Sequence, residues 1–344
     1  MTDMRKILSL LAVGVAAMAM VSCENQDTDF PDFDYQTGYF AYQTPIRTLV
    51  LGNDERTNNS IDNEHKVRIY AVAGGTRNGI KATLGFVVDE NLCNNLEFSD
   101  GTPVLPMPSD WYTIQGDQIP INGLNGYVEV QLNDAFFNDP KAIKNTYVIP
   151  LRLTDEYAGV DSILRGKPLV ENPWRLQSSD WSIAPKDYVL YLVKFISPWS
   201  GNYLRRGKDV IKENGTTTTN VRHEQYIEYD EVFNLATTAL NTVSYKFDNN
   251  CNLLLRFSED GSECTFATDN PDDYTVSGTG KYVYKEDNPK PDFWGEKPRD
   301  VIYLDYKVTV KTTGKTVETK DTLVARDRAV SGTAEEFSYI YNAQ

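Results

Sequence analysis

The sequence contains few of the residues from which metal centres and disulfide frameworks are built. Its 344 residues include 2 histidines and 4 cysteines, and no Cys-x-x-Cys spacing occurs. A structural zinc site needs four such ligands at short spacings, so neither a metal nor another cofactor is predicted. Beyond Cys23, the odd set of Cys93, Cys251 and Cys264 excludes a complete disulfide framework within the chain. The disulfide state of these three cysteines stays open.

Catalytic signatures are also missing from the sequence. It has no Gly-x-Ser-x-Gly nucleophile motif. A glycoside hydrolase needs two carboxylates on opposite sides of a sugar, one of them kept protonated. Among 49 acidic residues close pairs arise by chance, and none stands in a recognisable catalytic motif. No enzyme activity is therefore predicted, and a glycoside hydrolase with an unrecognised site is kept as the third alternative.

Positive charge is in deficit. Lys and Arg number 34 against 49 Asp and Glu, which gives a formal net charge of −15. A surface this acidic repels phosphate backbones, so no nucleic-acid partner is expected.

One long apolar run is present, at the N-terminus. Arg5 and Lys6 precede the apolar stretch 7–21, which is too short to span a bilayer core of about 30 Å as a stable helix. The run Met20-Val21-Ser22-Cys23 that follows resembles the lipobox of bacterial lipoproteins. We therefore expect a signal peptide at 1–22, cleaved before Cys23, which becomes the lipid attachment site. The alternative is a plain secretory signal followed by a coincidental cysteine.

An acidic tether is predicted at 23–33, with Glu24, Asp27, Asp29 and Asp32. It resembles the export signal of Bacteroidota lipoproteins that reach the outer face of the outer membrane. The expected localisation is the cell outer membrane, with the protein held by its lipid anchor alone and facing the extracellular surface. A merely solvated tether is the alternative interpretation.

Aromatic residues are abundant: 21 Tyr, 14 Phe and 5 Trp. Tyr and Phe favour pleated sheets, and here they recur in segments of period two, which indicates strands. In the range 34–196 such segments predict an immunoglobulin-like β-sandwich with a long excursion at 156–187. The predicted strands are Thr37–Tyr42, His65–Ala73, Lys81–Val88, Gly126–Leu132, Tyr147–Thr154 and Tyr188–Ile196.

The range 198–344 predicts a second all-β domain. Sequential antiparallel strands suggest an up-and-down β-barrel, whose closure removes unpaired edges, and an open second sandwich is the alternative. The predicted strands are Arg222–Leu235, Thr242–Asp248, Asn252–Ser258, Glu263–Thr268, Tyr274–Lys285, Val301–Lys311, Thr316–Arg326 and Phe337–Tyr341.

Four segments carry a resemblance to a known family. They are Gly126-Tyr-Val-Glu-Val-Gln-Leu132, Thr146-Tyr-Val-Ile-Pro-Leu-Arg-Leu-Thr154, Val189-Leu-Tyr-Leu-Val-Lys194 and Pro198-Trp-Ser-Gly-Asn-Tyr-Leu-Arg-Arg-Gly207. The layout resembles two-domain Bacteroidota surface lipoproteins of glycan-utilisation loci. Their N-terminal immunoglobulin-like domain also occurs in surface endo-β-N-acetylglucosaminidases, and their C-terminal domain is lipocalin-like. The resemblance implies a glycan-binding or adhesin-like role.

Aromatic residues in loops are the candidate glycan-binding residues, because a sugar ring packs its C–H face on an aromatic plane beside polar groups. The best candidates are Phe293 and Trp294, which lie in a proline-stiffened loop with Asp292 and Glu296. Trp174 and Trp181 in the excursion are further candidates, and covering a sheet edge is an equally good interpretation of them. Trp199 and Tyr203 are expected to pack at the domain interface or the barrel floor.

The predicted function is non-catalytic binding of oligosaccharides or polysaccharides at the cell surface, for a neighbouring outer-membrane glycan importer. The alternative is an adhesin or structural surface protein with a protein partner, because protein interfaces also favour Tyr and Trp. A small ligand inside the barrel is left open.

Overall fold

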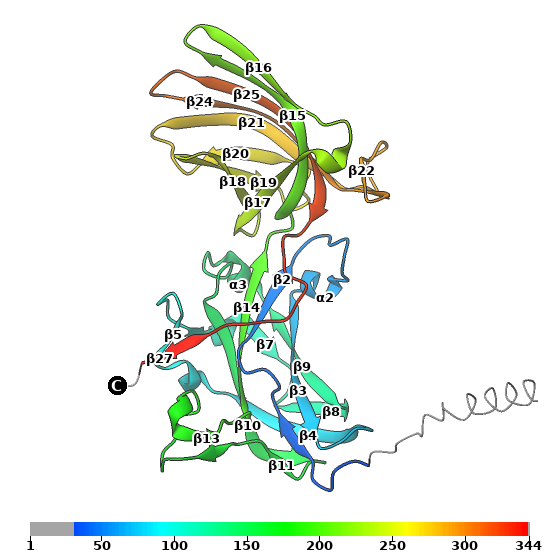
Figure 1. Ribbon diagram of the computed structural model, residues 1–344, viewed down its shortest axis with the longest axis vertical. Helices are drawn as coiled ribbons and strands as arrows, with labels where there is room; N and C mark the ends of the chain where they lie inside the picture. Colours follow the sequence, from blue (N-terminus) through cyan, green and yellow to red (C-terminus); the bar gives the residue numbers. More distant parts are fainter. Residues whose placement is uncertain (1–30, 343–344) are drawn as a thin grey trace, which may run out of the picture.

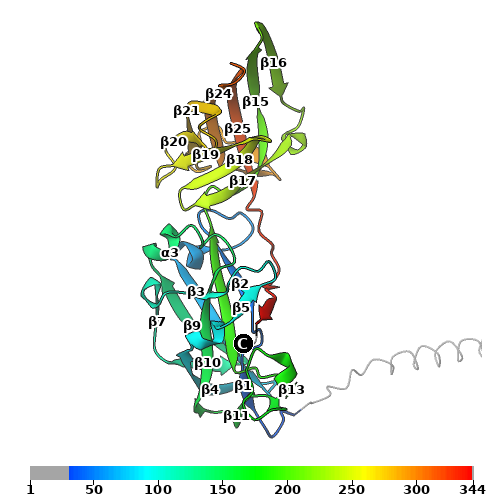
Figure 2. The ribbon, with the colours of Figure 1, turned by 90° about the vertical axis from the view of Figure 1, so that its left-hand side faces the viewer.

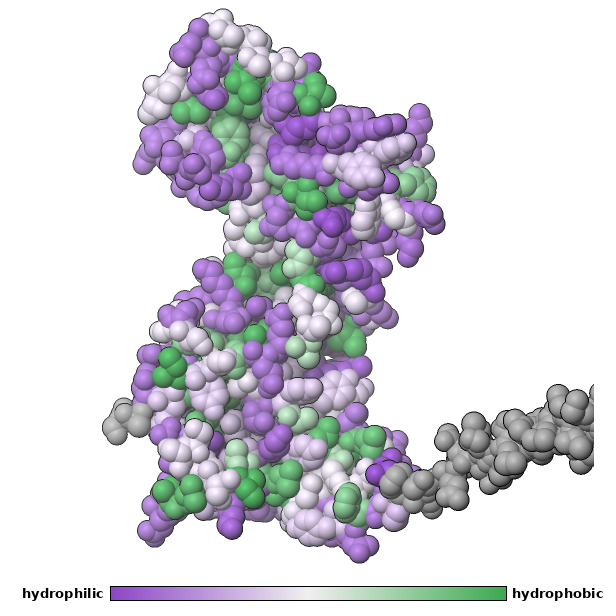
Figure 3. All heavy atoms as spheres, in the orientation of Figure 1, coloured by the Kyte–Doolittle hydropathy of each residue, from purple (hydrophilic) through white to green (hydrophobic). Residues whose placement is uncertain are grey.

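The computed structural model describes residues 31–342. The predicted signal peptide and Cys23 lie outside the described residues, as does most of the predicted tether. The described chain is almost entirely β-structure and forms two domains stacked end to end, which meet at a narrow waist (Figures 1, 2 and 3). Within 31–342 no helix is long and apolar enough to cross a membrane.

The first domain is a β-sandwich, as predicted. In one layer β3 (Lys66–Gly74) lies between β1 (Thr37–Tyr39) and β9 (Asn125–Leu132). In the other layer β10 (Tyr147–Ala158) and β14 (Tyr188–Ile196) are the central strands. Their alternate side chains face each other across a core that includes Ile69, Val130, Leu151 and Val193, all at most 1% exposed. The period of two in the sequence is thus the alternation between core and outer face.

The remaining strands and short helices of the first domain complete or surround these layers. Parallel pairing joins β2 to β14, with Arg47 opposite Val193 and Leu49 opposite Phe195. These elements are β2 (Pro45–Val50), β4 (Ile80–Val88), β5 (Leu96–Phe98), β6 (Leu105–Pro106), β7 (Tyr112–Ile114), β8 (Gln118–Gly123), β11 (Ser162–Ile163), β12 (Lys167–Pro168), β13 (Trp181–Ile183), α2 (Ser60–Asn63), α3 (Asp134–Asn138), η1 (Glu90–Cys93), η2 (Ser109–Trp111) and η3 (Ser178–Asp180).

The second domain is a closed antiparallel barrel of eight strands, which confirms the predicted fold class. Closure occurs where β15 pairs with β25, from Asn202 opposite Asp327 to Lys212 opposite Thr316. The barrel strands are β15 (Gly201–Glu213), β17 (Glu231–Ala239), β18 (Thr242–Asp248), β19 (Cys251–Phe257), β20 (Cys264–Thr268), β21 (Tyr274–Val283), β24 (Val301–Val310) and β25 (Thr316–Asp327).

One predicted barrel strand, Arg222–Leu235, is in fact two strands with a connection between them. The chain ends β16 (Thr216–Arg222), passes through the short helix η4 (Ile227–Tyr229) and re-enters the barrel as β17. Buried Asp230 fixes this connection, because its carboxylate accepts hydrogen bonds from Arg206 Nε (2.6 Å) and from the backbone N–H of Glu224 (3.0 Å). The predicted range therefore begins at the last residue of β16 and ends inside β17.

The prediction that Phe337–Tyr341 is a strand of the barrel was wrong, because this segment belongs to the sandwich. After β25 the chain leaves the barrel and runs back along the sandwich (Figure 1). There β26 (Glu335–Glu336) pairs with β2, and β27 (Tyr339–Tyr341) pairs with β5. Phe337 is buried in a second sandwich core on the outer face of β10 and β14. We call residues 329–338 the strap.

A buried arginine joins the two domains where the strap begins. Arg328 is 8% exposed, and its guanidinium donates four hydrogen bonds of 2.7–2.8 Å to backbone carbonyls. The acceptors are Leu51 and Asn53 in the sandwich, Ser197 between the domains, and Ser200 at the start of the barrel. Burial lowers the pKa of Arg328. Each domain thus supplies acceptors to one charge that is held between them.

Side chains of the barrel strands fill its interior. Near the sandwich the filling is apolar: Trp199 stacks on Phe257 with ring centroids 4.7 Å apart, and the Tyr203 hydroxyl donates to the Trp199 carbonyl. Trp199 and Tyr203 are therefore barrel-floor residues, as expected. Cys251, Cys264 and the sandwich's Cys93 are buried free thiols.

Candidate functional site

The hairpin predicted to bind glycan lies on the outer wall of the barrel. It consists of β22 (Phe293–Trp294) and β23 (Lys297–Pro298), with Phe293 opposite Pro298. Gly295 and Glu296 form its turn, and both have positive φ (60° and 62°), the conformation that tight two-residue hairpins require. Asp292 sits at the base, where its carbonyl accepts the backbone N–H of Arg299. The four candidates of this loop therefore share one small element.

The two aromatic residues of the hairpin have different roles. Trp294 is half-buried against an outer-wall cluster of Leu204, Val301 and Val324. The Arg299 guanidinium lies 4.8 Å from its ring centre and also donates to its carbonyl. Phe293, on the opposite side of the strand, is 56% exposed. Trp294 thus anchors the hairpin, and Phe293 presents a free aromatic face.

The fold brings further aromatic residues to this hairpin, from the connection between β16 and β17. Tyr226 and Tyr229 are 54% and 70% exposed, and their ring centroids lie 6.1 Å apart. Helix η4 lies against β22, and its Ile227 packs on the same outer-wall cluster as Trp294. We call Tyr226, Tyr229, Phe293 and Trp294 the aromatic patch. In Figure 3 this side of the barrel shows isolated apolar residues among hydrophilic ones.

Tyr226 and Tyr229 were missed in the sequence because their segment looked like part of a long strand. The signal that could have found them is the cluster Tyr226-Ile-Glu-Tyr229-Asp230, where two aromatics at a spacing of three stand beside two acids. Such a spacing fits one turn of helix better than a strand, because side chains three apart share a helix face.

Trp174 and Trp181 lie in the sandwich, away from the aromatic patch (Figure 1 labels β13 and β22). Trp174 packs into the second sandwich core and stacks on Tyr341, with centroids 5.9 Å apart. Trp181 is half-buried, and its indole N–H donates to the Trp174 carbonyl (2.8 Å). The structure thus uses this pair to cover the outer face of the sandwich sheet together with the end of the chain.

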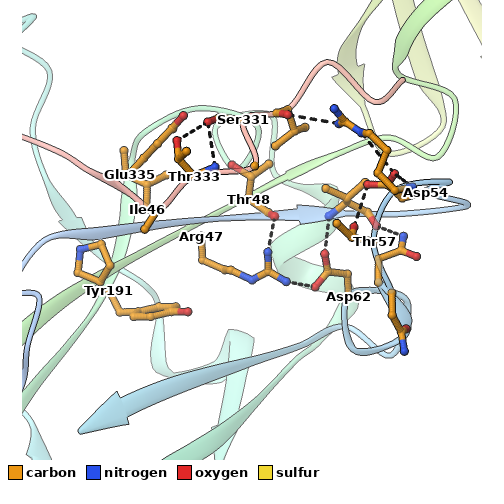
Figure 4. Close-up of a pocket in the computed structure, with 18 of the residues that line it drawn as sticks. Ile46, Arg47, Thr48, Asp54, Thr57, Asp62, Tyr191, Ser331, Thr333 and Glu335 are labelled. Atoms are coloured by element: carbon orange, nitrogen blue, oxygen red, sulfur yellow. Dashed lines mark hydrogen bonds and ion pairs between the residues drawn. The ribbon is translucent and has the colours of Figure 1, made fainter. Parts of the chain in front are cut away.

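A second candidate region, absent from the sequence analysis, is a cleft of about 590 Å³ beside β2. Three segments that are distant in the sequence enclose it: β2, the loop 51–62, and the strap (Figure 4). We call it the strap cleft. Most of its lining residues have polar side chains, and Tyr42 and Tyr191 are its aromatic members.

An ion pair between Arg47 and Asp62 forms one wall of the strap cleft. Asp62 also accepts the backbone N–H of Val50 (2.8 Å), and Arg47 donates to the Thr48 carbonyl (3.0 Å). Burial raises the pKa of Asp62, while the hydrogen bond from Val50 and the charge of Arg47 oppose the rise. The side chain of Asp62 is 3% exposed and that of Arg47 is 39% exposed. The guanidinium is thus fixed in direction and still open to the cleft.

Comparisons with known proteins agree with the two-domain division. Residues 33–158 match a family model described as an N-terminal domain, and residues 198–329 match the domain of unknown function DUF5627. No curated protein matches the chain.

One solved structure is similar over most of the chain: a protein of unknown function from Bacteroides ovatus. It is 42% identical, with a TM-score of 0.82 over 90% of this chain and 100% of that chain. A second Bacteroides ovatus protein, provisionally named a carbohydrate-binding protein, is 11% identical over 86% of this chain and 98% of its own. Its TM-score of 0.24 is too low to support an argument. The 42% identity is sufficient: the chain belongs to the same family as the first Bacteroides ovatus protein.

Proposed function

We propose that this protein is a non-catalytic surface lipoprotein that binds glycans through the aromatic patch, for a neighbouring outer-membrane uptake system. The observation that carries the proposal is the gathering of Tyr226, Tyr229 and Phe293, each more than half exposed, from two separate segments onto one wall of the barrel. Exposed large aromatics are costly to leave in water, and grouped ones mark interaction sites.

The physical case for a sugar ligand rests on what surrounds these rings. Glu228, Asp292 and Glu296 lie in the same two elements, so acceptors for sugar hydroxyls stand beside the aromatic faces. Buried Asp230 and half-buried Trp294 fix the two elements from below, which reduces the entropy lost on binding. Because the barrel interior is filled by its own side chains, its outer wall is the place where a ligand can be held.

A glycan array tests the proposal, using the mature chain with Cys23→Ser to prevent lipidation. Any polysaccharide that binds is then measured against the triple variant Tyr226→Ala, Tyr229→Ala, Phe293→Ala by affinity electrophoresis. Each ring contributes about 1 kcal/mol to binding, so the triple variant should bind on the order of 100-fold more weakly. The matched control replaces three exposed aromatics of the sandwich, Phe33, Tyr35 and Tyr157, with alanine.

The alternatives give different outcomes in the same experiment. Release of sugar products from a bound glycan would show an enzyme and overturn the non-catalytic assignment. The alternative of an adhesin would be favoured by two results together. The chain would bind no host, plant or microbial glycan, and it would capture a protein that the triple variant does not bind.

A further inference from the structure

The strap cleft has a preorganised wall with an unused polar group. Tyr191 rises from β14 beside Arg47, and burial raises its pKa to about 12, so its hydroxyl stays protonated at neutral pH. Within residues 31–342 no hydrogen-bond partner of this hydroxyl is found, and the residue, which is partly buried, lines the cleft (Figure 4). Its hydroxyl can therefore form hydrogen bonds with water or with a ligand hydroxyl in the cleft.

The opposite wall is the strap, which fixed contacts hold over the cleft. Arg56 from the loop donates to the Val330 carbonyl (3.3 Å), and Ser331 and Thr333 share a hydrogen bond of 2.7 Å. Beyond them β26 pairs with the start of β2 at Pro45 and Ile46. The strap is therefore tied to the sandwich on both sides of the cleft, and the cavity exists before any ligand arrives.

The charges that line the cleft nearly cancel. Arg47 and Arg56 stand against Asp54, Asp62 and Glu335, and Asp54 accepts hydrogen bonds from the Thr57 hydroxyl (3.0 Å) and the Arg56 backbone N–H (2.9 Å). An anion would meet Glu335 and a chain of net charge −15. An apolar ligand would leave the open guanidinium of Arg47 and the hydroxyl of Tyr191 without hydrogen bonds to it. The lining fits an uncharged ligand that is rich in hydroxyl groups.

The aromatic members favour a sugar among such ligands. Tyr42 is 57% exposed at the rim, and Tyr191 lies at the inner wall. A sugar presents a C–H face to an aromatic ring and hydroxyls to the groups around it. A volume of about 590 Å³ lies within the range of small-ligand sites.

We propose that the strap cleft is a second glycan-binding site, which takes a short uncharged oligosaccharide and is separate from the aromatic patch. The proposal rests on the proposed function in that it assumes a glycan-binding protein. The patch would hold a long chain by its surface, and the cleft would enclose a short one between Arg47, Tyr191 and the strap.

The test is saturation-transfer NMR on the Cys23→Ser chain, with uncharged tri- and tetrasaccharides of glucose, mannose, galactose or N-acetylglucosamine as probes. Thr333→Trp places a bulky ring in the cleft from the exposed strap and should abolish the signal. Thr313→Trp, at the exposed turn between β24 and β25, is the matched control and should leave it unchanged. Tyr191→Phe removes only the hydroxyl and should weaken binding about fivefold, whereas Tyr157→Phe should not.

The results separate this inference from the proposed function. The aromatic-patch triple variant should lose the polysaccharide and keep the oligosaccharide. If Thr333→Trp binds oligosaccharide as well as the unmodified chain does, the cleft is not the site, and the patch proposal is untouched. Polysaccharide binding with no oligosaccharide binding overturns the cleft alone. A chain that binds neither probe overturns both proposals.

Discussion

The two domains each bury an aspartate between two arginines, and they do so in different surroundings. In the sandwich, Asp187 is fully buried, and Arg165 and Arg175, which pair with it, keep 35% and 31% side-chain exposure. In the barrel, Asp321 pairs with Arg205 and Arg222, whose side chains are only 13% and 16% exposed. The arginines paired with Asp187 thus reach the surface of the sandwich, whereas those paired with Asp321 lie mostly inside the barrel.

The ion pairs of the barrel lie where strand β15 changes its pairing partner. At Gly207, strand β15 leaves β17 and continues beside β16, with Gly207 opposite both Arg222 and Asp321. A Cβ at Gly207 would lie 2.2 Å from a carboxylate oxygen of Asp321, so glycine leaves the space that the carboxylate occupies. Burial alone would lower the pKa of Arg205, but the neighbouring Asp321 raises it above its ordinary value. The comparison teaches that the barrel interior combines an apolar core with buried ion pairs, whereas the two proposed binding regions lie at the outer wall of the barrel and at the edge of the sandwich.

The difference between the two domains is tested most directly by replacing Asp187 and Asp321. Asp321→Ala leaves two poorly hydrated arginines inside the barrel and should cost about 3–5 kcal/mol of unfolding free energy. Asp187→Ala should cost less, because its arginines can turn toward water. Chemical denaturation measures both. An equal or larger loss in Asp187→Ala would contradict the distinction between arginines at the surface and arginines in the interior.

The second prediction concerns the joint between the domains. Arg328→Met fills a similar volume and removes the arginine donor from the carbonyls of Leu51, Asn53 and Ser200, while the Ser197 carbonyl keeps the backbone N–H of Ser200. We expect a loss of about 2–3 kcal/mol and separation of one calorimetric transition into two. A single transition at the original temperature would show that the strap, and not Arg328, couples the domains.

The third prediction distinguishes Trp294, which anchors the hairpin to the barrel wall, from Phe293, which presents a free aromatic face. Trp294→Ala should lower the unfolding free energy by about 2 kcal/mol, roughly half the cost of truncating a fully buried tryptophan. Phe293→Ala should leave stability within about 0.5 kcal/mol, as for other exposed positions, and still weaken glycan binding. Thermal melts beside affinity electrophoresis give both quantities. If Phe293→Ala destabilises the barrel as much as Trp294→Ala, its ring is structural.

The smallest expected effect is a pH dependence at the barrel end of the waist. Hydrogen bonds, first from the Ser258 hydroxyl and then from Ser262, lower the pKa of Asp260 to about 2. A lowered carboxylate pKa contributes stability that is present above its ordinary value of 3.8 and is lost as the pH falls through about 2. Ser258→Ala should move the NMR titration of Asp260 upward toward 3.8. Asp100, in the other domain, should titrate as before.

Alternation in the sequence was sufficient to predict the fold class and many of the longer strands, but not the short strands β5–β8 and β11–β13. The runs that became β19 and β24 bury alternate side chains against one core, and the more continuously apolar runs that became β10 and β14 are buried on both faces. Pro45–Val50 was missed, because β2 lacks alternation and joins β14 in parallel from far away in the sequence. Phe337–Tyr341 was assigned to the wrong domain, because a strand pattern indicates a strand and does not specify its partner.

The candidate sites were predictable only where one segment contains them. Phe293 and Trp294 stood out because prolines surround them, but the sequence could not tell that one faces water and the other the barrel wall. Tyr226, Tyr229 and the strap cleft depend on contacts between distant segments. No local pattern specifies such contacts, so these sites became visible only in the folded chain.

The most direct test of the central claim is polysaccharide affinity electrophoresis of the Cys23→Ser chain, the aromatic-patch triple variant and the sandwich triple control, with the best glycan from the array in the gel. We predict that the unmodified chain and the control are retarded equally and that the patch variant migrates as if no glycan were present. Equal retardation of all three proteins would contradict the claim that the outer wall of the barrel binds glycan.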